Sequence, residues 1–200
     1  MPSVLKKALT RMRPEPVMPG PRGQVVGFVN DHRNGWFDKE AGQLAKGFPI
    51  SKDDVFIDVG CGDGGVAKFA AQMGSEVIAT DIDPRAVKRT AEMLKHSGST
   101  RFRVEVSDSN PLPVADNTCT RVACLEVLEH VDSPQQLITE LVRIAKPGAL
   151  FLLAAPDERS EAMQQGLAPA AYWESPNHLR VFSRVAFSTL VENAGLTIEN

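Results

Sequence analysis

Short apolar runs alternate with amphipathic stretches over residues 54–198, and each pattern predicts a different kind of element. The apolar runs predict buried strands at residues 55–59, 76–80, 102–106, 121–125, 150–154 and 196–198. The amphipathic stretches predict helices at residues 64–73, 84–95, 134–145 and 184–195. Strands that alternate with helices need crossover connections, so the pattern predicts an α/β fold with a mostly parallel sheet and helices on both faces.

Capping residues indicate where three of these helices begin. Asp83 and Ser133 each stand directly before a proline, which suits the first position of a helix. Ser183 has the same place before the last helix, and the Lys-Pro-Gly run at residues 146–148 is expected to end the third.

The chain before residue 51 has a different pattern and divides into two parts. Residues 1–22 predict a short basic helix followed by a proline-rich linker, whose helix allows weak contact with a membrane surface. We favour a frayed basic terminus for this helix. Residues 23–50 predict a mostly helical cap or lid, with Phe28, Trp36 and Phe37 as its apolar anchors. Residues 51–200 form the main domain.

Composition narrows the class of protein. A chain of 200 residues points to one domain, and a net charge of −3 gives no bulk attraction to nucleic acid. Three cysteines without paired spacing indicate reduced thiols, as in a cytoplasmic protein. No apolar run is long enough to span a membrane, and no signal peptide is evident at the N-terminus.

A glycine-rich turn at residues 58–65 connects the first predicted strand to the first helix. Glycines allow a sharp turn and let a ligand come close to main-chain N–H groups. Gly60, Gly62 and Gly65 fit the fingerprint of a dinucleotide site, and glycines here could also serve only to tighten the turn. The turn alone therefore leaves the cofactor open.

Three carboxylates near strand ends bear on the identity of the cofactor. The first argues against a nicotinamide dinucleotide, and the other two support binding of a nucleoside. Asp58 stands two residues before the first glycine, where it can meet an ammonium group and would repel a pyrophosphate. Asp81 ends the second strand, where it can accept hydrogen bonds from ribose hydroxyls in either type of site. Asp108 follows the third strand and can accept one from an adenine amino group.

With these features the chain resembles the class I methyltransferases that depend on S-adenosylmethionine (SAM). The resemblance covers about residues 54–195. The motifs that carry it are VFIDVGCGDG at 55–64, TDIDP at 80–84, DSNPLP at 108–113, LEVLEHV at 125–131 and KPG at 146–148. It implies a Rossmann-like, doubly wound fold with SAM as the cofactor and S-adenosylhomocysteine as the product.

The resemblance also implies a set of cofactor-binding residues. The methionine part of SAM would be held by Asp58, Gly60, Cys61 and Gly62. Asp81 would bind the ribose, with Ile82 against the adenine face. Asp108 and Ser109 would meet the adenine edge, and Glu126 would lie where methyl donor and acceptor meet.

The chain departs from the family in two places. Cys119-Thr120 replaces a frequent Phe-Asp pair before the fourth strand, a change that we expect to be mainly structural. The sequence ends within the sixth predicted strand, so we expect the family's last antiparallel strand to be missing from it. An exposed sheet edge favours association, so a homodimer is one expectation.

The mouth of the site contains several acidic and histidine side chains. Glu126, Glu129 and His130 stand at helix spacings of three and four. With His178 they resemble the Glu-x-x-Glu-His metal site of ubiquinone-pathway O-methyltransferases and of methyltransferases that act on small-RNA 3′ ends. We favour local packing over metal binding. Glu126, His130 and His178 are the candidate catalytic residues, the histidines as general bases.

The leading hypothesis is therefore an enzyme that methylates a small molecule, most readily on oxygen, and nucleic acid is an unlikely substrate. Two other hypotheses stay open. One is a protein that binds SAM without turnover, and the other is a nicotinamide-dependent oxidoreductase.

Overall fold

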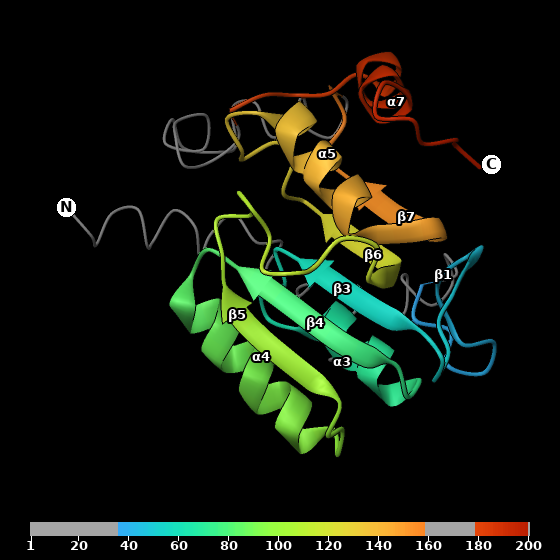
Figure 1. The fold of residues 1–200 in the computed structure, drawn as a ribbon, viewed down its shortest axis with the longest axis vertical. Coiled ribbons are helices and arrows are strands. Elements are labelled where there is room, and N and C mark those ends of the chain that lie inside the picture. The colour runs from blue at the N-terminus through green and yellow to red at the C-terminus, as the bar shows by residue number, and fades with distance from the viewer. Residues whose placement is uncertain (1–35, 159–178, 200) are drawn as a thin grey trace, which may run out of the picture.

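A five-stranded parallel sheet in the order β5-β4-β3-β6-β7 forms the centre of the computed structural model, which describes residues 36–158 and 179–199 (Figure 1). Its strands are β3 (Val55–Val59), β4 (Glu76–Asp81), β5 (Phe102–Val106), β6 (Cys119–Leu125) and β7 (Ala145–Ala154). The chain runs outward from β3 to β5 and then returns to β6. The order of the strands therefore reverses between β3 and β6, which is where α/β sheets of this kind bind ligands.

Within the described residues the helices that connect or follow these strands are α3 (Gly65–Gln72), α4 (Pro84–His96), α5 (Pro134–Ile144) and α7 (Arg184–Glu192). The predicted caps are confirmed: the side chains of Asp83, Ser133 and Ser183 accept hydrogen bonds from backbone N–H groups of the first turn of α4, α5 and α7. No helix in the described part of the chain has the length and apolar character needed to cross a bilayer.

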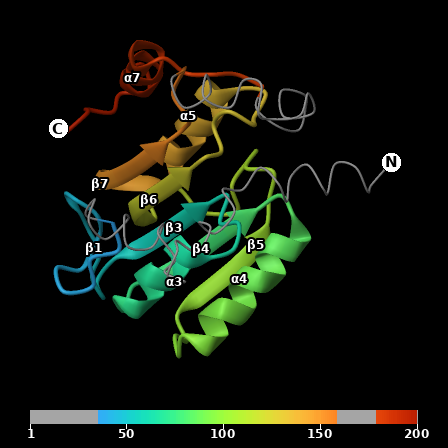
Figure 2. The same ribbon diagram turned by 180° about the vertical axis from the view of Figure 1, so that it is seen from behind.

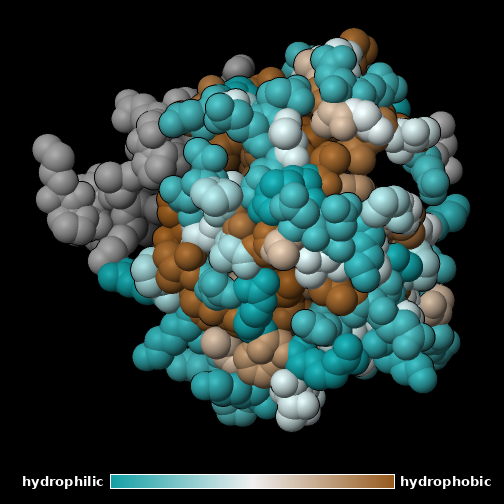
Figure 3. All heavy atoms as spheres, viewed as in Figure 1, coloured by the Kyte–Doolittle hydropathy of each residue, from teal (hydrophilic) through white to brown (hydrophobic). Residues whose placement is uncertain are grey.

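The helices cover both faces of the sheet, as predicted for a doubly wound fold (Figures 1 and 2). Alternate residues of β3 point to opposite sides: Phe56 packs with α3, whereas Ile57 packs with α5. Each of these two residues is fully buried, so the central strand has apolar layers on both sides. Figure 3 shows that hydrophilic side chains predominate on one outer face of the molecule.

The predicted helical cap is wrong for its described part, residues 36–50. This part forms a small antiparallel hairpin of β1 (Gln43–Ala45) and β2 (Phe48–Pro49). Gly42 and Gly47 have φ values of 65° and 83°, a left-handed conformation that interrupts a helix. Leu44 and Phe48 bury their side chains in the α3 core, and the ring of Phe37 lies 5.7 Å from that of Phe69. Residues 1–35, with the predicted basic helix and linker, lie outside the described residues.

Two predictions near the C-terminus also need correction. β7 begins at Ala145 rather than at Leu150, because Ala145 pairs with Cys119 before the register shifts around Gly148. The sixth strand predicted at residues 196–198 is not formed. Leu196 instead packs against the core next to α7 as a partly buried side chain, after a left-handed turn at Gly195. The described sheet therefore has five parallel strands.

Candidate active site

The candidate site lies along the carboxyl ends of β3, β4, β5 and β6, which meet at one edge of the parallel sheet (Figure 2). Each strand is followed there by one of the predicted groups: the glycine turn, Asp81, the loop at Asp108, and Glu126. The sheet thus brings to one edge residues that are separated by up to 68 positions in the sequence.

Asp58 is a buried carboxylate on the central strand, with 3% of its surface exposed. Its Oδ2 accepts a hydrogen bond from the backbone N of Ala67 in the first turn of α3, at 3.1 Å. Burial, together with the negative charges of Asp81 and Asp63, raises the pKa of Asp58 to about 7, although the hydrogen bond from Ala67 opposes the shift. A cationic group placed next to Asp58 would favour its ionised form, as the ammonium of a methionine moiety does.

The glycine turn is fixed against two neighbouring strands. The backbone N–H groups of Gly60 and Cys61 both donate to the carbonyl oxygen of Thr80, at 2.8 and 2.9 Å. Gly60 has a φ of 76°, and a Cβ atom there would lie 2.3 Å from Cγ2 of Val127, in the loop after β6. Only glycine therefore allows the loops after β3 and β6 to approach each other this closely.

Asp81 connects the turn to the end of β4. Its Oδ2 accepts from the backbone N of Gly62 at 2.8 Å, and its Oδ1 accepts from the backbone N of Asp83 at 2.9 Å. Each carboxylate oxygen keeps a second lone pair, so Asp81 can still accept hydrogen bonds from ribose hydroxyls. Ile82 follows with 71% of its surface exposed, which leaves an apolar side chain available to a planar base.

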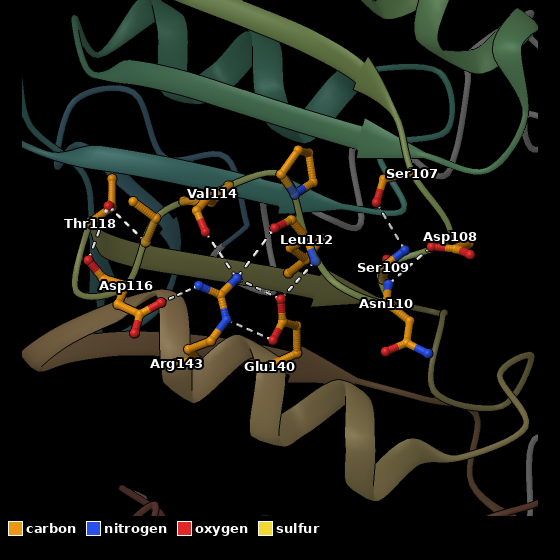
Figure 4. A network of polar contacts seen from close by, with 12 residues as sticks. Ser107, Asp108, Ser109, Asn110, Leu112, Val114, Asp116, Thr118, Glu140 and Arg143 are labelled. Atoms are coloured by element: carbon orange, nitrogen blue, oxygen red, sulfur yellow. Dashed lines mark hydrogen bonds and ion pairs between the residues drawn. The ribbon is translucent and has the colours of Figure 1, made fainter.

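The loop after β5 is shaped by its own side chains (Figure 4). Ser107 Oγ accepts from the N of Ser109 at 2.9 Å, and Asp108 Oδ1 accepts from the N of Asn110 at 3.0 Å. The N of Ser107 in turn donates to the carbonyl of Asp81 at 3.0 Å. Ser107 was missed by the sequence analysis, although its position directly after a predicted strand was a signal for it.

The segment after β6 is not the helix that the spacing of its residues suggested. Glu126 is exposed with a φ of 56°, and residues 128–130 form a turn. Glu129 is 1% exposed, and its carboxylate lies 3.6 Å from Nε2 of His130. Glu126 and His130 thus do not share a helix face. Within the described residues no group of three or more candidate metal ligands is assembled, and His178 lies outside them.

Arg180 packs onto this turn from a distant part of the sequence. Its guanidinium donates to the backbone carbonyls of Leu128, Val131 and Asp132. The N of Leu179 also donates to the carbonyl of Glu129, at 2.8 Å. This role of Arg180 was not predicted from the sequence, because contacts with backbone carbonyls leave no motif in it.

The three cysteines are all buried and none forms a disulfide. Burial raises the pKa of Cys61 to about 12 and that of Cys119 to about 11, and it also raises the pKa of Cys124. Cys61 therefore contributes its backbone N–H to the glycine turn, while its thiol stays protonated near neutral pH.

Two cavities bounded by described residues, of about 280 and 390 Å³, lie at the opposite edge of the sheet. The first is lined by residues at the start of β7 and the second by residues near the ends of α3 and α4. Neither contains a residue of the candidate site. The candidate site is therefore identified by the carboxylates and glycines of its loops and not by either of these cavities.

Comparisons with known proteins agree with this geometry. Residues 57–153 match a family described as a methyltransferase domain. Norajmaline N-methyltransferase from Rauvolfia serpentina is 29% identical over 139 residues, which cover 68% of this chain and 46% of that protein. A ubiquinone biosynthesis O-methyltransferase from Xanthomonas axonopodis pv. citri is 28% identical over 151 residues, with 72% and 63% covered. The chain thus spans less than two thirds of the length of these relatives.

A solved structure shares the fold. The crystal structure of a SAM-dependent methyltransferase from Aquifex aeolicus superposes with a TM-score of 0.64 and 23% sequence identity, covering 88% of each chain. At this level of identity the likeness concerns the arrangement of helices and strands.

Proposed function

We propose that this protein transfers the methyl group of SAM to a small-molecule acceptor, because residues 57–153 match a methyltransferase domain. The product would be S-adenosylhomocysteine. The observation that carries the proposal is the buried carboxylate of Asp58, placed at the reversal of strand order beside a glycine turn. A nicotinamide dinucleotide would bring its pyrophosphate to this turn, where that carboxylate would repel it.

The residues present fit each part of the cofactor. Asp58 would accept a hydrogen bond from the ammonium group of SAM. The N–H groups of the turn at residues 60–62 would face the methionine part. Asp81 would accept from the ribose hydroxyls. Ile82 would cover the adenine face, with Asp108 and Ser109 at its edge. SAM supplies a methyl group already activated on a sulfonium, so the protein has to orient an acceptor and deprotonate it.

We propose oxygen as the acceptor atom and His130 as the general base. His130 is partly exposed, and the buried carboxylate of Glu129 lies 3.6 Å from its Nε2. A buried carboxylate orients an imidazole and stabilises the positive charge that it gains on accepting a proton. The O-methyltransferase relative supports oxygen, and the N-methyltransferase relative makes nitrogen the competing acceptor. His178 stays a predicted second base.

A metal-assisted variant is the second candidate, because the ubiquinone biosynthesis O-methyltransferase is among the relatives. The predicted ligands Glu126, Glu129, His130 and His178 would form its site. The burial of Glu129 beside His130 favours local packing instead. Methyl transfer that persists after treatment with a chelator would exclude the metal-assisted variant.

The remaining proposals concern partners and location. A net charge of −3 supports a small molecule rather than nucleic acid as the acceptor. Three unpaired cysteines support a cytoplasmic location. In the sheet of the described residues β7 is an edge strand, which supports a homodimer. The basic N-terminal segment supports at most weak contact with a membrane surface.

Thermal unfolding with ligands tests the proposed function. We expect S-adenosylhomocysteine at about 100 times its Kd to stabilise the fold by about 2.7 kcal/mol. For a protein of this size, that corresponds to a rise in Tm of roughly 5–10 °C. NADH at the same concentration should leave Tm unchanged, and a preference for NADH would overturn the proposal. Release of S-adenosylhomocysteine from SAM in the presence of a panel of phenols and amines then distinguishes an enzyme from a protein that only binds.

A further inference from the structure

Two charged side chains on α5 hold the loop that follows β5. Glu140 and Arg143, called here the α5 pair, face that loop from the helix (Figure 4). Arg143 donates through Nε to Oε2 of Glu140 at 2.8 Å and through Nη2 to Oε1 at 2.6 Å. This two-point contact keeps the guanidinium in one orientation, which is the strong form of an arginine–carboxylate pair.

The α5 pair also forms hydrogen bonds with the loop after β5. Nη2 of Arg143 also donates to the carbonyls of Val114 at 2.9 Å and Leu112 at 3.3 Å, and Nη1 contacts the carboxylate of Asp116. Oε1 of Glu140 accepts from the backbone N of Leu112 at 2.7 Å. The pair therefore binds both the N–H and the carbonyl of one loop residue, which fixes its peptide planes.

The same loop begins with the residues proposed to meet adenine. Ser107, Asp108 and Ser109 are shaped by hydrogen bonds within the segment 107–110, and these bonds do not fix the segment relative to α5. Pro111 and Pro113 stand on either side of Leu112 and restrict rotation about φ. A change in the orientation of Leu112 is thus transmitted toward Ser109 rather than absorbed between them.

We infer that Glu140 and Arg143 are positioning residues for the adenine end of SAM, because they fix the loop on which Asp108 and Ser109 stand. This inference rests on the proposed function. Neither residue needs to touch the cofactor: the contacts of the α5 pair are with loop residues 112–116, three or more positions beyond Ser109. Leu112 and Val114 are buried in the core and hold the loop to the domain independently. Loss of the pair should therefore move the loop without unfolding it.

Arg101 provides a matched control. Like Arg143, it donates to two backbone carbonyls and pairs with a carboxylate: it contacts the carbonyls of Lys52 at 3.1 Å and Gly74 at 3.2 Å, and it pairs with Glu76. These contacts lie at the amino ends of the strands, whereas the candidate site lies at their carboxyl ends. Arg101→Gln therefore measures the effect of losing such a bridge on a fold whose cofactor loops are unchanged.

The experiment compares two ligands that differ only at the edge of the base. S-adenosylhomocysteine presents an amino group to Asp108, whereas S-inosylhomocysteine presents a carbonyl oxygen, which a carboxylate repels. We expect the wild-type chain to prefer the adenine ligand in calorimetric titration. In Arg143→Gln the Kd for S-adenosylhomocysteine should rise about tenfold, comparable to one hydrogen bond to a charged group. The Kd for S-inosylhomocysteine should change less than about threefold, so the preference shrinks.

Further variants separate positioning from general loss of stability. Arg143→Lys keeps a charge but not the fork of donors, and it should restore part of the preference. Arg101→Gln should keep the full preference at a similar loss of Tm. Should Arg143→Gln fail to fold, Glu140→Gln serves the same test, since it breaks the ion pair but keeps an acceptor for Leu112.

The possible outcomes separate failure of the proposed function from failure of the inference about the α5 pair. If the wild-type chain binds neither SAM nor S-adenosylhomocysteine, the proposed function fails and the inference fails with it. If the wild-type chain binds and the α5 variants show an unchanged adenine preference, the inference alone is overturned. An equal loss of preference in Arg101→Gln would also overturn it.

Discussion

At the scale of single residues, Asp58 is an ionisable group buried at the centre of the candidate site. Burial raises its pKa to about 7, against an ordinary value of 3.8. Between these values the folded protein binds a proton that the unfolded chain has released. Stability without cofactor therefore decreases as pH rises through this window, and it is lowest above pH 7.

This shift makes the stability of the cofactor-free protein depend on Asp58. In thermal unfolding from about pH 4.5 to pH 8, we expect Asp58→Asn to gain Tm relative to the wild-type chain as pH rises, because an amide has no charge to desolvate. The same variant should lose affinity for S-adenosylhomocysteine. Other carboxylates titrate in both proteins, so the difference between the two profiles is the quantity to measure. Parallel profiles would contradict the assignment.

Gly60 has a steric role that a second glycine can isolate. Gly60→Ala would place a Cβ 2.3 Å from Cγ2 of Val127 at a φ of 76°, whereas Gly98, with a φ of 81°, has nothing within 4 Å of its Cβ position. We expect Gly98→Ala to cost about 1–2 kcal/mol of unfolding free energy for the left-handed backbone alone. Gly60→Ala should cost more than this and weaken binding of S-adenosylhomocysteine at least about tenfold, because the turn must move.

A second substitution checks that Val127 is the cause. The three atoms nearest to the Cβ position at Gly60 all belong to Val127, so Val127→Ala should recover part of the stability lost in Gly60→Ala. Chemical denaturation of the single and double variants measures this coupling. Strict additivity of the two substitutions would show that the close approach of the two loops is not the source of the cost.

At the scale of elements, Thr120 connects the start of β6 to the start of β3. Its Oγ1 donates to Oδ1 of Asp54 at 2.8 Å and accepts from the N of Val55 at 3.1 Å. Burial alone would raise the pKa of Asp54, but hydrogen bonds from Thr120 and Ser51, together with the charge of Arg121, lower it below its usual value. The stabilisation from this carboxylate is therefore present above its ordinary pKa and is lost on acidification.

The replacement of the family's Phe-Asp pair by Cys119-Thr120 should therefore affect stability and not the cofactor. We expect Thr120→Val to lower the free energy of unfolding by about 1–3 kcal/mol, because it leaves the N of Val55 and one oxygen of Asp54 without this partner. Affinity for S-adenosylhomocysteine should stay within about twofold, since Thr120 lies at the amino end of β6, whereas the candidate site lies at the carboxyl ends of the strands. A large loss of affinity would contradict the structural role.

Elements with strong local signals were predicted well from the sequence. The bounds of β3 were predicted to the residue, and α4 starts at Pro84 as the cap at Asp83 indicated. The predictions failed where tertiary packing decides. The hairpin at residues 43–49 depends on left-handed glycines and on burial against α3, and the turn after β6 depends on the burial of Glu129. Neither condition is visible in residue spacing.

At the scale of the whole molecule, the sheet explains which site residues could be found from the sequence. Asp58, Asp81, Asp108 and Glu126 each follow or end a predicted strand, so parallel topology alone predicts that they lie along one edge. Arg143 and Arg180 act through backbone carbonyls that are distant in the sequence. Such partners have no side-chain signature, and only the folded chain reveals them.

The burial of all three thiols has a practical consequence for labelling this protein. Because the pKa values of Cys61, Cys119 and Cys124 are raised by burial, alkylating reagents near neutral pH should leave the native chain unmodified. A cysteine introduced at the exposed position of Asn110 would then take a fluorophore selectively, without removal of any native cysteine. The emission of that label would report changes in the surroundings of the loop after β5 in real time.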